Sequence, residues 1–178
     1  MTHRPSRPRT AAVAVVGTLA AVVLGAAGCS TEKAAAGGSE EALQNAFAAS
    51  EAALRKLEKL PVDGPVASAD FLTPEYLEQH NAMSRSIEAG GNRMVGQRRF
   101  ESIKRVQYSI WPRPVTSMRV CSVGDVRMLD EKGKDVTVGL DRKPKPRGQS
   151  REAIVYDLES RDEGKTFLVK GALPDGTC

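Results

Sequence analysis

Residues 116–130 read TSMRVCSVGDVRMLD, and the predicted sheet is built around this segment. Its valines and methionines are interspersed with polar residues, a pattern typical of a half-buried strand. We predict one long strand, with a bulge at Gly124. The next residues, Asp130–Gly133, carry the polar residues and the glycine of a hairpin turn. A long strand in the middle of the chain indicates a sheet that the flanking segments complete.

Strand patterns continue on both sides of this stretch. Before it, residues 98–111 alternate polar and apolar side chains, and Pro112 and Pro114 interrupt the run. After it, residues 151–159 and 166–171 predict two further strands. The segment between those two, Ser160–Gly164, is polar and predicts a turn.

The first segment of regular structure is predicted to be helical. Residues 41–60, EALQNAFAASEAALRKLEKL, place apolar residues at three- and four-residue steps. Ser39 stands where an N-terminal cap is expected, and Pro61 is expected to end the helix. The apolar stripe consists of Leu43, Ala46, Phe47, Ser50, Leu54 and Leu57.

A second helix is predicted after a connector over residues 61–72. Thr73 is the expected cap, Pro74 suits the first turn, and Gly90-Gly91 end the helix. Its predicted apolar stripe consists of Tyr76, Leu77, His80, Met83 and Ile87.

Two helices followed by about four or five antiparallel strands predict an α+β domain over residues 41–178, with the helices packed on a curved sheet. This order of elements resembles the nuclear-transport-factor-2-like, or cystatin-like cone, fold of small actinobacterial secreted lipoproteins. The resemblance rests on FLTPEY (Phe71–Tyr76), which leads into the second helix, and on Cys121 within a strand that ends at the Val126–Gly133 hairpin. It implies a cone with a pocket between helices and sheet, where enzymes of that family place an acid or a base.

The first 28 residues have the order of an export signal. Residues 1–10 contain three arginines and no acid, and residues 11–28 carry no charge. The run ends in Ala26-Ala27-Gly28-Cys29, which resembles the lipobox of bacterial lipoproteins, with Ala26 where leucine is commonest. The resemblance implies cleavage before Cys29 and acylation of its sulfur. A transmembrane anchor is the alternative, because 18 apolar residues approach a span.

Lipidation at Cys29 predicts a protein anchored at the outer face of the cytoplasmic membrane, or secreted if the lipobox is not used. No twin arginine precedes the apolar run, so we favour the general secretory route. Residues 29–40 are expected to be a flexible tether with a root-mean-square span of about 18 Å. Removal of residues 1–28 leaves 23 basic and 22 acidic residues of the original 26 and 22. This near-neutral balance and export argue against a nucleic-acid partner.

Cysteine usage also fits export. The chain has three cysteines, and lipidation of Cys29 leaves Cys121 and Cys178 as a pair. In an oxidising compartment such a pair tends to close, so we predict a Cys121–Cys178 disulfide. Two unrelated buried thiols are the alternative.

Chemistry-bearing motifs are scarce. His80 is the only histidine after residue 28, and the chain has no Cys-x-x-Cys, nucleophile-elbow or phosphate-loop signature. We therefore expect no metal and no cofactor. His80 could act as a general base, with Tyr108 or Tyr156 nearby. The alternative is a partly buried histidine with one hydrogen bond.

A basic segment stands out between the predicted strands. Residues 141–150, DRKPKPRGQS, predict an exposed loop stiffened by its prolines. Its four cations could rest on anionic lipid headgroups or wall polymers, and the alternative is that they belong to the solvated faces of strands. The cations are Arg142, Lys143, Lys145 and Arg147.

The sequence as a whole predicts a non-catalytic binding or scaffolding lipoprotein of the cell envelope, with an envelope protein as its partner. The alternative is a small-molecule-binding or weakly catalytic cone with a pocket at His80. A space filled by Phe47, Leu54 and Ile110 would favour the first hypothesis, and a large apolar pocket facing His80 would favour the second.

Overall fold

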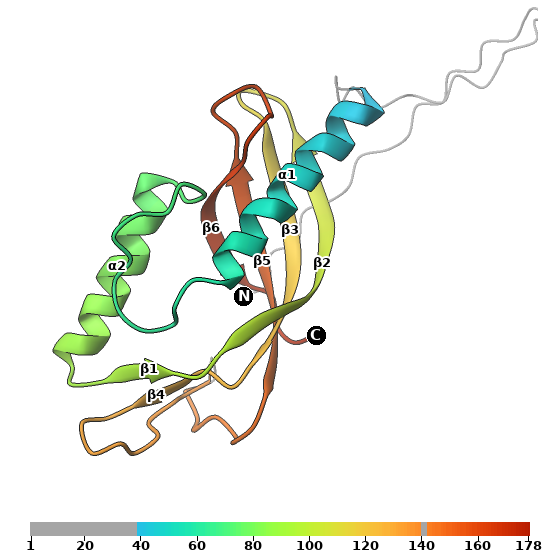
Figure 1. The fold of residues 1–178 in the computed structure, drawn as a ribbon. Helices are drawn as coiled ribbons and strands as arrows, with labels where there is room; N and C mark the ends of the chain where they lie inside the picture. The colour runs from blue at the N-terminus through green and yellow to red at the C-terminus, as the bar shows by residue number, and fades with distance from the viewer. Residues whose placement is uncertain (1–38, 140–141) are drawn as a thin grey trace, which may run out of the picture. The chain divides into compact units, whose positions relative to one another are not determined.

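The computed structural model describes residues 39–139 and 142–178, which form two helices and six strands (Figure 1). The predicted signal peptide, Cys29 and the predicted tether up to residue 38 lie outside the described residues. The helices are α1 (Glu40–Glu58) and α2 (Pro74–Ala89). The strands are β1 (Arg93–Val95), β2 (Arg98–Ser109), β3 (Val115–Gly124), β4 (Arg127–Leu129), β5 (Ser150–Glu159) and β6 (Leu168–Pro174). The predicted α+β class is confirmed.

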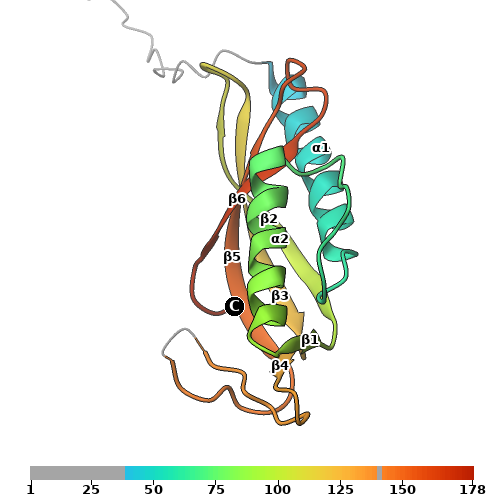
Figure 2. The same ribbon diagram turned by 90° about the vertical axis from the view of Figure 1, so that its left-hand side faces the viewer.

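The main sheet is antiparallel, curved and four-stranded, in the order β2-β3-β5-β6, and β1 pairs with β4 in a separate two-stranded sheet. The helix α1 crosses the concave face of the main sheet, and α2 lies beside the sheet along β6 (Figures 1 and 2). Both helices contribute to the same apolar core, to which α2 adds Tyr76 and Leu77. Every described element is therefore part of one layered domain.

The first helix forms where the sequence predicts it. The Ser39 side chain accepts a hydrogen bond from the Ala42 backbone N–H at 3.2 Å, which caps the helix. Leu54 is fully buried, and Phe47 and Leu57 are buried beside it. Ser50 is also buried, and its hydroxyl lies 2.6 Å from the Thr116 hydroxyl of β3. The predicted stripe thus faces the sheet, and its single hydroxyl has a partner there.

The second helix begins as predicted, and four residues of its predicted stripe are half-buried: Tyr76, Leu77, His80 and Ile87. Thr73 accepts a hydrogen bond from the Tyr76 N–H at 3.2 Å, and Gly90 follows the last turn. Met83, predicted to be apolar contact surface, is 62% exposed, so that prediction is wrong. Ser84 is the buried residue of this helix, because α2 meets the domain through β6 and β1 at a slightly rotated face. The helix carries little apolar burial.

The long strand predicted over residues 116–130 is two strands, so that prediction is also wrong. The main sheet ends at Gly124, and the chain then leaves it to pair β4 with β1. A side chain at Gly124 would overlap the carbonyl oxygen of Gln97, so the backbones of β2 and β3 approach closely here. The change of sheet at this glycine takes the place of the predicted bulge. The turn at Asp130–Gly133 is confirmed by a 2.9 Å hydrogen bond from the Gly133 N–H to the Asp130 oxygen.

The strands after the basic loop match their predictions within a few residues. Between β5 and β6 the chain turns at Ser160, whose hydroxyl accepts a hydrogen bond from the Gly164 N–H at 2.8 Å. On the face opposite the helices, Cys121 and Cys178 form a disulfide that joins the C-terminal residue to β3. The predicted disulfide is confirmed. No helix of the described residues is long and apolar enough to span a membrane.

Candidate functional site

A small polar cavity lies where β2 begins and β3 ends. Its volume is about 150 Å³, which on the order of five water molecules would fill. Alternate residues of β5 point into it, because successive strand side chains face opposite sides of a sheet. The lining residues are Arg98, Ser122, Gly124, Val126, Lys145, Ser150, Glu152, Ile154 and Tyr156.

Arg98 is the main cation of this cavity. It lies at the start of β2, directly opposite Gly124 in the register, where the missing side chain leaves it room. One guanidinium nitrogen donates to the Leu57 carbonyl oxygen at 3.1 Å, in the last turn of α1, where a cation is favoured. Its Nε is buried and has no hydrogen-bond partner among the described residues. A buried donor without a partner costs free energy, so this nitrogen is suited to an incoming acceptor.

The Arg98 charge affects the pKa of three further side chains, Tyr76, His80 and Tyr156. Burial raises the pKa of Tyr156 to about 12, and the Tyr76 hydroxyl adds to this rise while Arg98 opposes it. Burial also raises the pKa of Tyr76, again against Arg98. His80 responds the other way, since burial first and the Arg98 charge second lower its pKa. Tyr76, His80 and Tyr156 are therefore neutral at pH 7 and leave Arg98 as the charge of the cluster.

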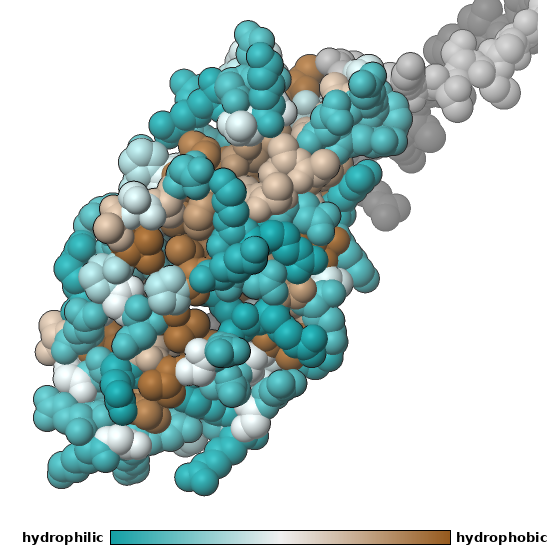
Figure 3. Space-filling model, in the orientation of Figure 1, coloured by the Kyte–Doolittle hydropathy of each residue, from teal (hydrophilic) through white to brown (hydrophobic). Residues whose placement is uncertain are grey.

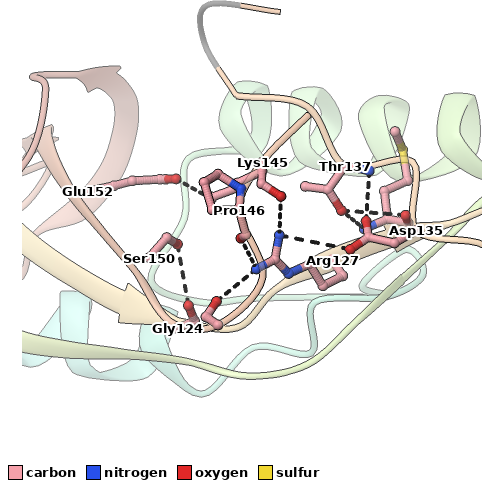
Figure 4. A network of polar contacts seen from close by, with 10 residues as sticks. Gly124, Arg127, Asp135, Thr137, Lys145, Pro146, Ser150 and Glu152 are labelled. Carbon is pink, nitrogen blue, oxygen red and sulfur yellow. Dashed lines mark hydrogen bonds and ion pairs between the residues drawn. The ribbon is translucent and has the colours of Figure 1, made fainter. Parts of the chain in front are cut away.

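An ion pair between Lys145 and Glu152 borders the cavity. Lys145 belongs to the basic loop, which Arg127 fastens to the body of the domain (Figure 4). The Arg127 guanidinium donates to the carbonyl oxygens of Lys145, Pro146 and Gly148, the last at 2.8 Å. Three carbonyl acceptors on one guanidinium fix the loop next to the site.

The basic loop is less available than the sequence indicates. Lys145 is half-buried and paired with Glu152, so it is not a free surface cation. Arg142, Lys143 and Arg147 are exposed. The Arg147 charge helps lower the pKa of Asp135, although hydrogen bonds from Thr137 are the larger cause. Contact of this loop with an anionic surface stays a prediction.

Of the residues proposed for acid–base chemistry, the structure sets Tyr108 apart and leaves His80 and Tyr156 near the same arginine. His80 Nε2 is buried without a hydrogen-bond partner among the described residues. The hydrogen bond expected for a partly buried, non-catalytic histidine is therefore also missing at this nitrogen. Tyr156 lies in the cavity and interacts with the same arginine. Tyr108 lies against the Phe47 ring, with 6.2 Å between ring centroids, and is not part of the cavity lining. A base needs an oriented imidazole and a nearby acid, and the described residues show neither for His80.

The remaining candidates are a metal site and the three residues expected to fill the space beneath the helices. Within residues 39–139 and 142–178, no three His, Cys, Asp or Glu residues gather in a way that could hold a metal ion. Phe47 and Leu54 fill the space beneath α1, as one hypothesis required, but Ile110 is 38% exposed and fills nothing there. Sequence reasoning missed Arg98 and Glu152. The signal for Arg98 was its position two residues before the buried Phe100, on the same face of an alternating strand.

Comparison with known proteins adds no relative. No family profile matches the sequence, and no curated protein matches it.

Proposed function

We propose that the protein is an extracytoplasmic lipoprotein, held to the outer face of the cytoplasmic membrane by an acylated Cys29, whose domain is a non-catalytic binding module of the cell envelope. The observation that carries the proposal is the pairing of Cys121 with Cys178. Disulfides persist in oxidising compartments, and this one uses two of the three cysteines of the chain. The third, Cys29, stands at the end of the apolar signal and is left for lipid.

The arrangement of the domain supports a binding role. Two helices on one side of a curved sheet match the element order of the cystatin-like cone, to which we propose the domain belongs. Phe47 and Leu54 fill the space between α1 and the sheet, and the hollow of about 300 Å³ beside α1 is lined by Ala53 and Lys56 on the helix side. A partner would then engage the exposed faces, which Figure 3 shows as apolar residues surrounded by hydrophilic ones on the helical side.

Membrane retention of a Cys29→Ala variant tests the anchor. We expect the wild-type chain in the membrane fraction, and an inhibitor of lipoprotein signal peptidase should make the uncleaved precursor accumulate. The variant should lose the lipid and leave the membrane fraction after signal cleavage. Cys121→Ala serves as the matched control, because it removes a cysteine but not the anchor. Equal membrane retention of Cys29→Ala and wild type would refute the proposal.

A second candidate function is recognition of a small anionic molecule in the cavity at Arg98. The buried, partnerless Arg98 Nε is the observation that favours it, with the partnerless His80 Nε2 in the same electrostatic cluster. The volume of about 150 Å³ suits a group of carboxylate or phosphate size. Arginine binds such groups through paired N–H donors.

Titration with malonate and with inorganic phosphate tests this second candidate. We expect one of these anions to raise the thermal midpoint of the wild type and of Arg99→Gln, but not of Arg98→Gln. Arg99 is the matched control because it is the neighbouring arginine, is exposed, and points to the opposite face of the strand from Arg98. Each variant is compared with its own anion-free midpoint. Equal shifts in all three proteins, or none in any, would exclude the cavity as an anion site.

A further inference from the structure

The turn between β2 and β3 exposes the largest apolar side chain of the domain. Trp111 is 83% exposed, and its neighbour Ile110 is 38% exposed. Tryptophan is a highly buried residue on average, so this degree of exposure is unusual. Prolines at positions 112 and 114 restrict the backbone just after it, and Ser109 donates to the Trp111 carbonyl oxygen at 3.3 Å. The ring is thus displayed on a short, restrained hairpin.

This hairpin lies at the end of the domain where α1 begins (Figures 1 and 2). Phe47 contacts Tyr108, and Phe47 is about 12 Å along the helix from Ser39. β2 runs back toward the start of α1 (Figure 1), and Trp111 follows the last residue of this strand, Ser109, by two positions. The exposed ring and the first helical residue are therefore at about the same level. The basic loop lies at the opposite end (Figure 1), and Val138 pairs with Pro144 of that loop.

The tip is mixed in charge. Arg113 follows the tryptophan, and the turn after β5 brings Arg161 and Glu163 alongside, around a hollow of about 500 Å³. Ser160 joins the two turns, because its N–H donates to the Pro114 carbonyl oxygen at 2.9 Å. An apolar ring with cations and acids beside it suits zwitterionic headgroups, where the amphipathic indole of tryptophan is favoured.

We propose that the β2–β3 hairpin is a second membrane contact, in which Trp111 inserts into the headgroup layer of the bilayer that carries the anchor. The inference rests on the proposed lipidation of Cys29. Ten peptide links separate Cys29 from Ser39, and they span at most about 36 Å. The end where α1 begins therefore stays close to the bilayer, and Trp111 is the side chain at that end with the chemistry of an interfacial anchor. One lipid site and one aromatic contact together fix the orientation of the domain and hold its opposite end away from the membrane.

Trp111 is the only tryptophan of the chain, so its own fluorescence reports its surroundings. The full-length protein is purified from membranes and reconstituted into zwitterionic phospholipid vesicles, with or without brominated acyl chains. We expect emission at shorter wavelength than in the detergent-free Cys29→Ala protein, loss of most emission with brominated lipid, and protection from acrylamide. Neither salt nor added anionic lipid should change this result.

The matched control moves the reporter to the other end of the domain. Trp111→Phe combined with Val138→Trp places one tryptophan at a residue that is 54% exposed and distant from α1's first turn. Its emission should be quenched by acrylamide and unaffected by brominated lipid. Solvent-exposed emission of Trp111 on vesicles, or equal bromine quenching at both positions, would overturn the proposal. So would a shielded Trp111 that brominated lipid does not quench, because a protein surface or a second copy would then cover it.

Failure of the anchor is distinguishable from failure of this contact. If Cys29 carries no lipid, membrane fractionation shows it independently of fluorescence. The unlipidated protein is then added to the same vesicles. Bromine quenching of Trp111 there supports the contact without the anchor, and its absence overturns the contact.

Discussion

The two helices contact the same sheet in opposite ways. Beneath α1 the contact is mostly apolar and closely packed, with Leu54 0% exposed and the Ser50 hydroxyl satisfied by Thr116. Beside α2 the contact is sparse and polar, and Ser84 is the only buried residue of the helix. Among the described residues, the buried His80 Nε2 of α2 lacks a partner, as does the Nε of Arg98, whose guanidinium also donates to the Leu57 carbonyl oxygen of α1.

The difference indicates that α1 contributes mainly to stability and the α2 half mainly to binding. Apolar burial beneath α1 supplies most of the stabilisation that a packed helix contributes, because stability scales with the apolar surface removed from water. The α2 half leaves polar groups unsatisfied, which is costly for stability and useful for binding. We interpret α1 with the sheet as the scaffold and the α2 half as the adaptable part.

Shortening a core leucine should break the scaffold and produce the largest effect. Leu54→Ala removes a fully buried side chain, and we expect a loss of about 4 kcal/mol in the free energy of unfolding. Met83→Ala in α2 should change it by less than about 0.5 kcal/mol, because that side chain is exposed. Denaturant unfolding measures both. Similar losses for the two variants would contradict the difference between the helices.

Removal of the disulfide should weaken the sheet behind the cavity. Cys121 precedes Ser122, which lines the cavity from the other face of β3. Replacing both Cys121 and Cys178 by alanine opens a link across 57 residues of sequence, and we expect a loss of about 3 kcal/mol. Chemical denaturation of the oxidised wild type and the double variant gives the value. An unchanged midpoint would show that the link contributes nothing to stability.

Alkaline pH should act on the cavity through Tyr156. Its pKa of about 12 in the folded state lies above the ordinary value of 10, so the unfolded chain loses this proton first. Stability is therefore unaffected below pH 10 and falls as the pH rises toward 12, by about 2 kcal/mol from this group. Tyr156→Phe should remove that part of the decline. Identical alkaline profiles of the two proteins would mean that Tyr156 is not buried as described.

Acidic pH should produce the smallest of these effects, through His80. Burial and Arg98 lower its pKa, so the unfolded chain binds a proton before the folded one as the pH falls below 6.5. Stability should decline through this window in the wild type and decline less in His80→Gln. A histidine NMR titration gives the pKa of the folded protein directly. A value above 6.5 would place an acidic partner at His80, contrary to the structure.

Sequence periodicity predicted the elements whose faces differ in polarity. The α1 stripe, the cap at Thr73 and the strands around Cys121 follow from local patterns that the packing preserves. The exit at Gly124 was not predictable, because the close approach of Gln97 is a tertiary contact. Met83 was misplaced because the buried face of α2 is rotated slightly from the predicted stripe, toward Ser84. The cavity is lined by residues from β2, β3, β5 and the basic loop, which are far apart in the sequence, so no local pattern predicts that they lie together.

Hydrogen exchange of backbone amides tests the difference between the two helices most directly. In the native protein at pH 7, we predict slow exchange over Phe47–Leu57 of α1 and exchange at least about tenfold faster over Tyr76–Ile87 of α2. Equal protection of the two helices would contradict the account of α1 as scaffold and α2 as the adaptable half.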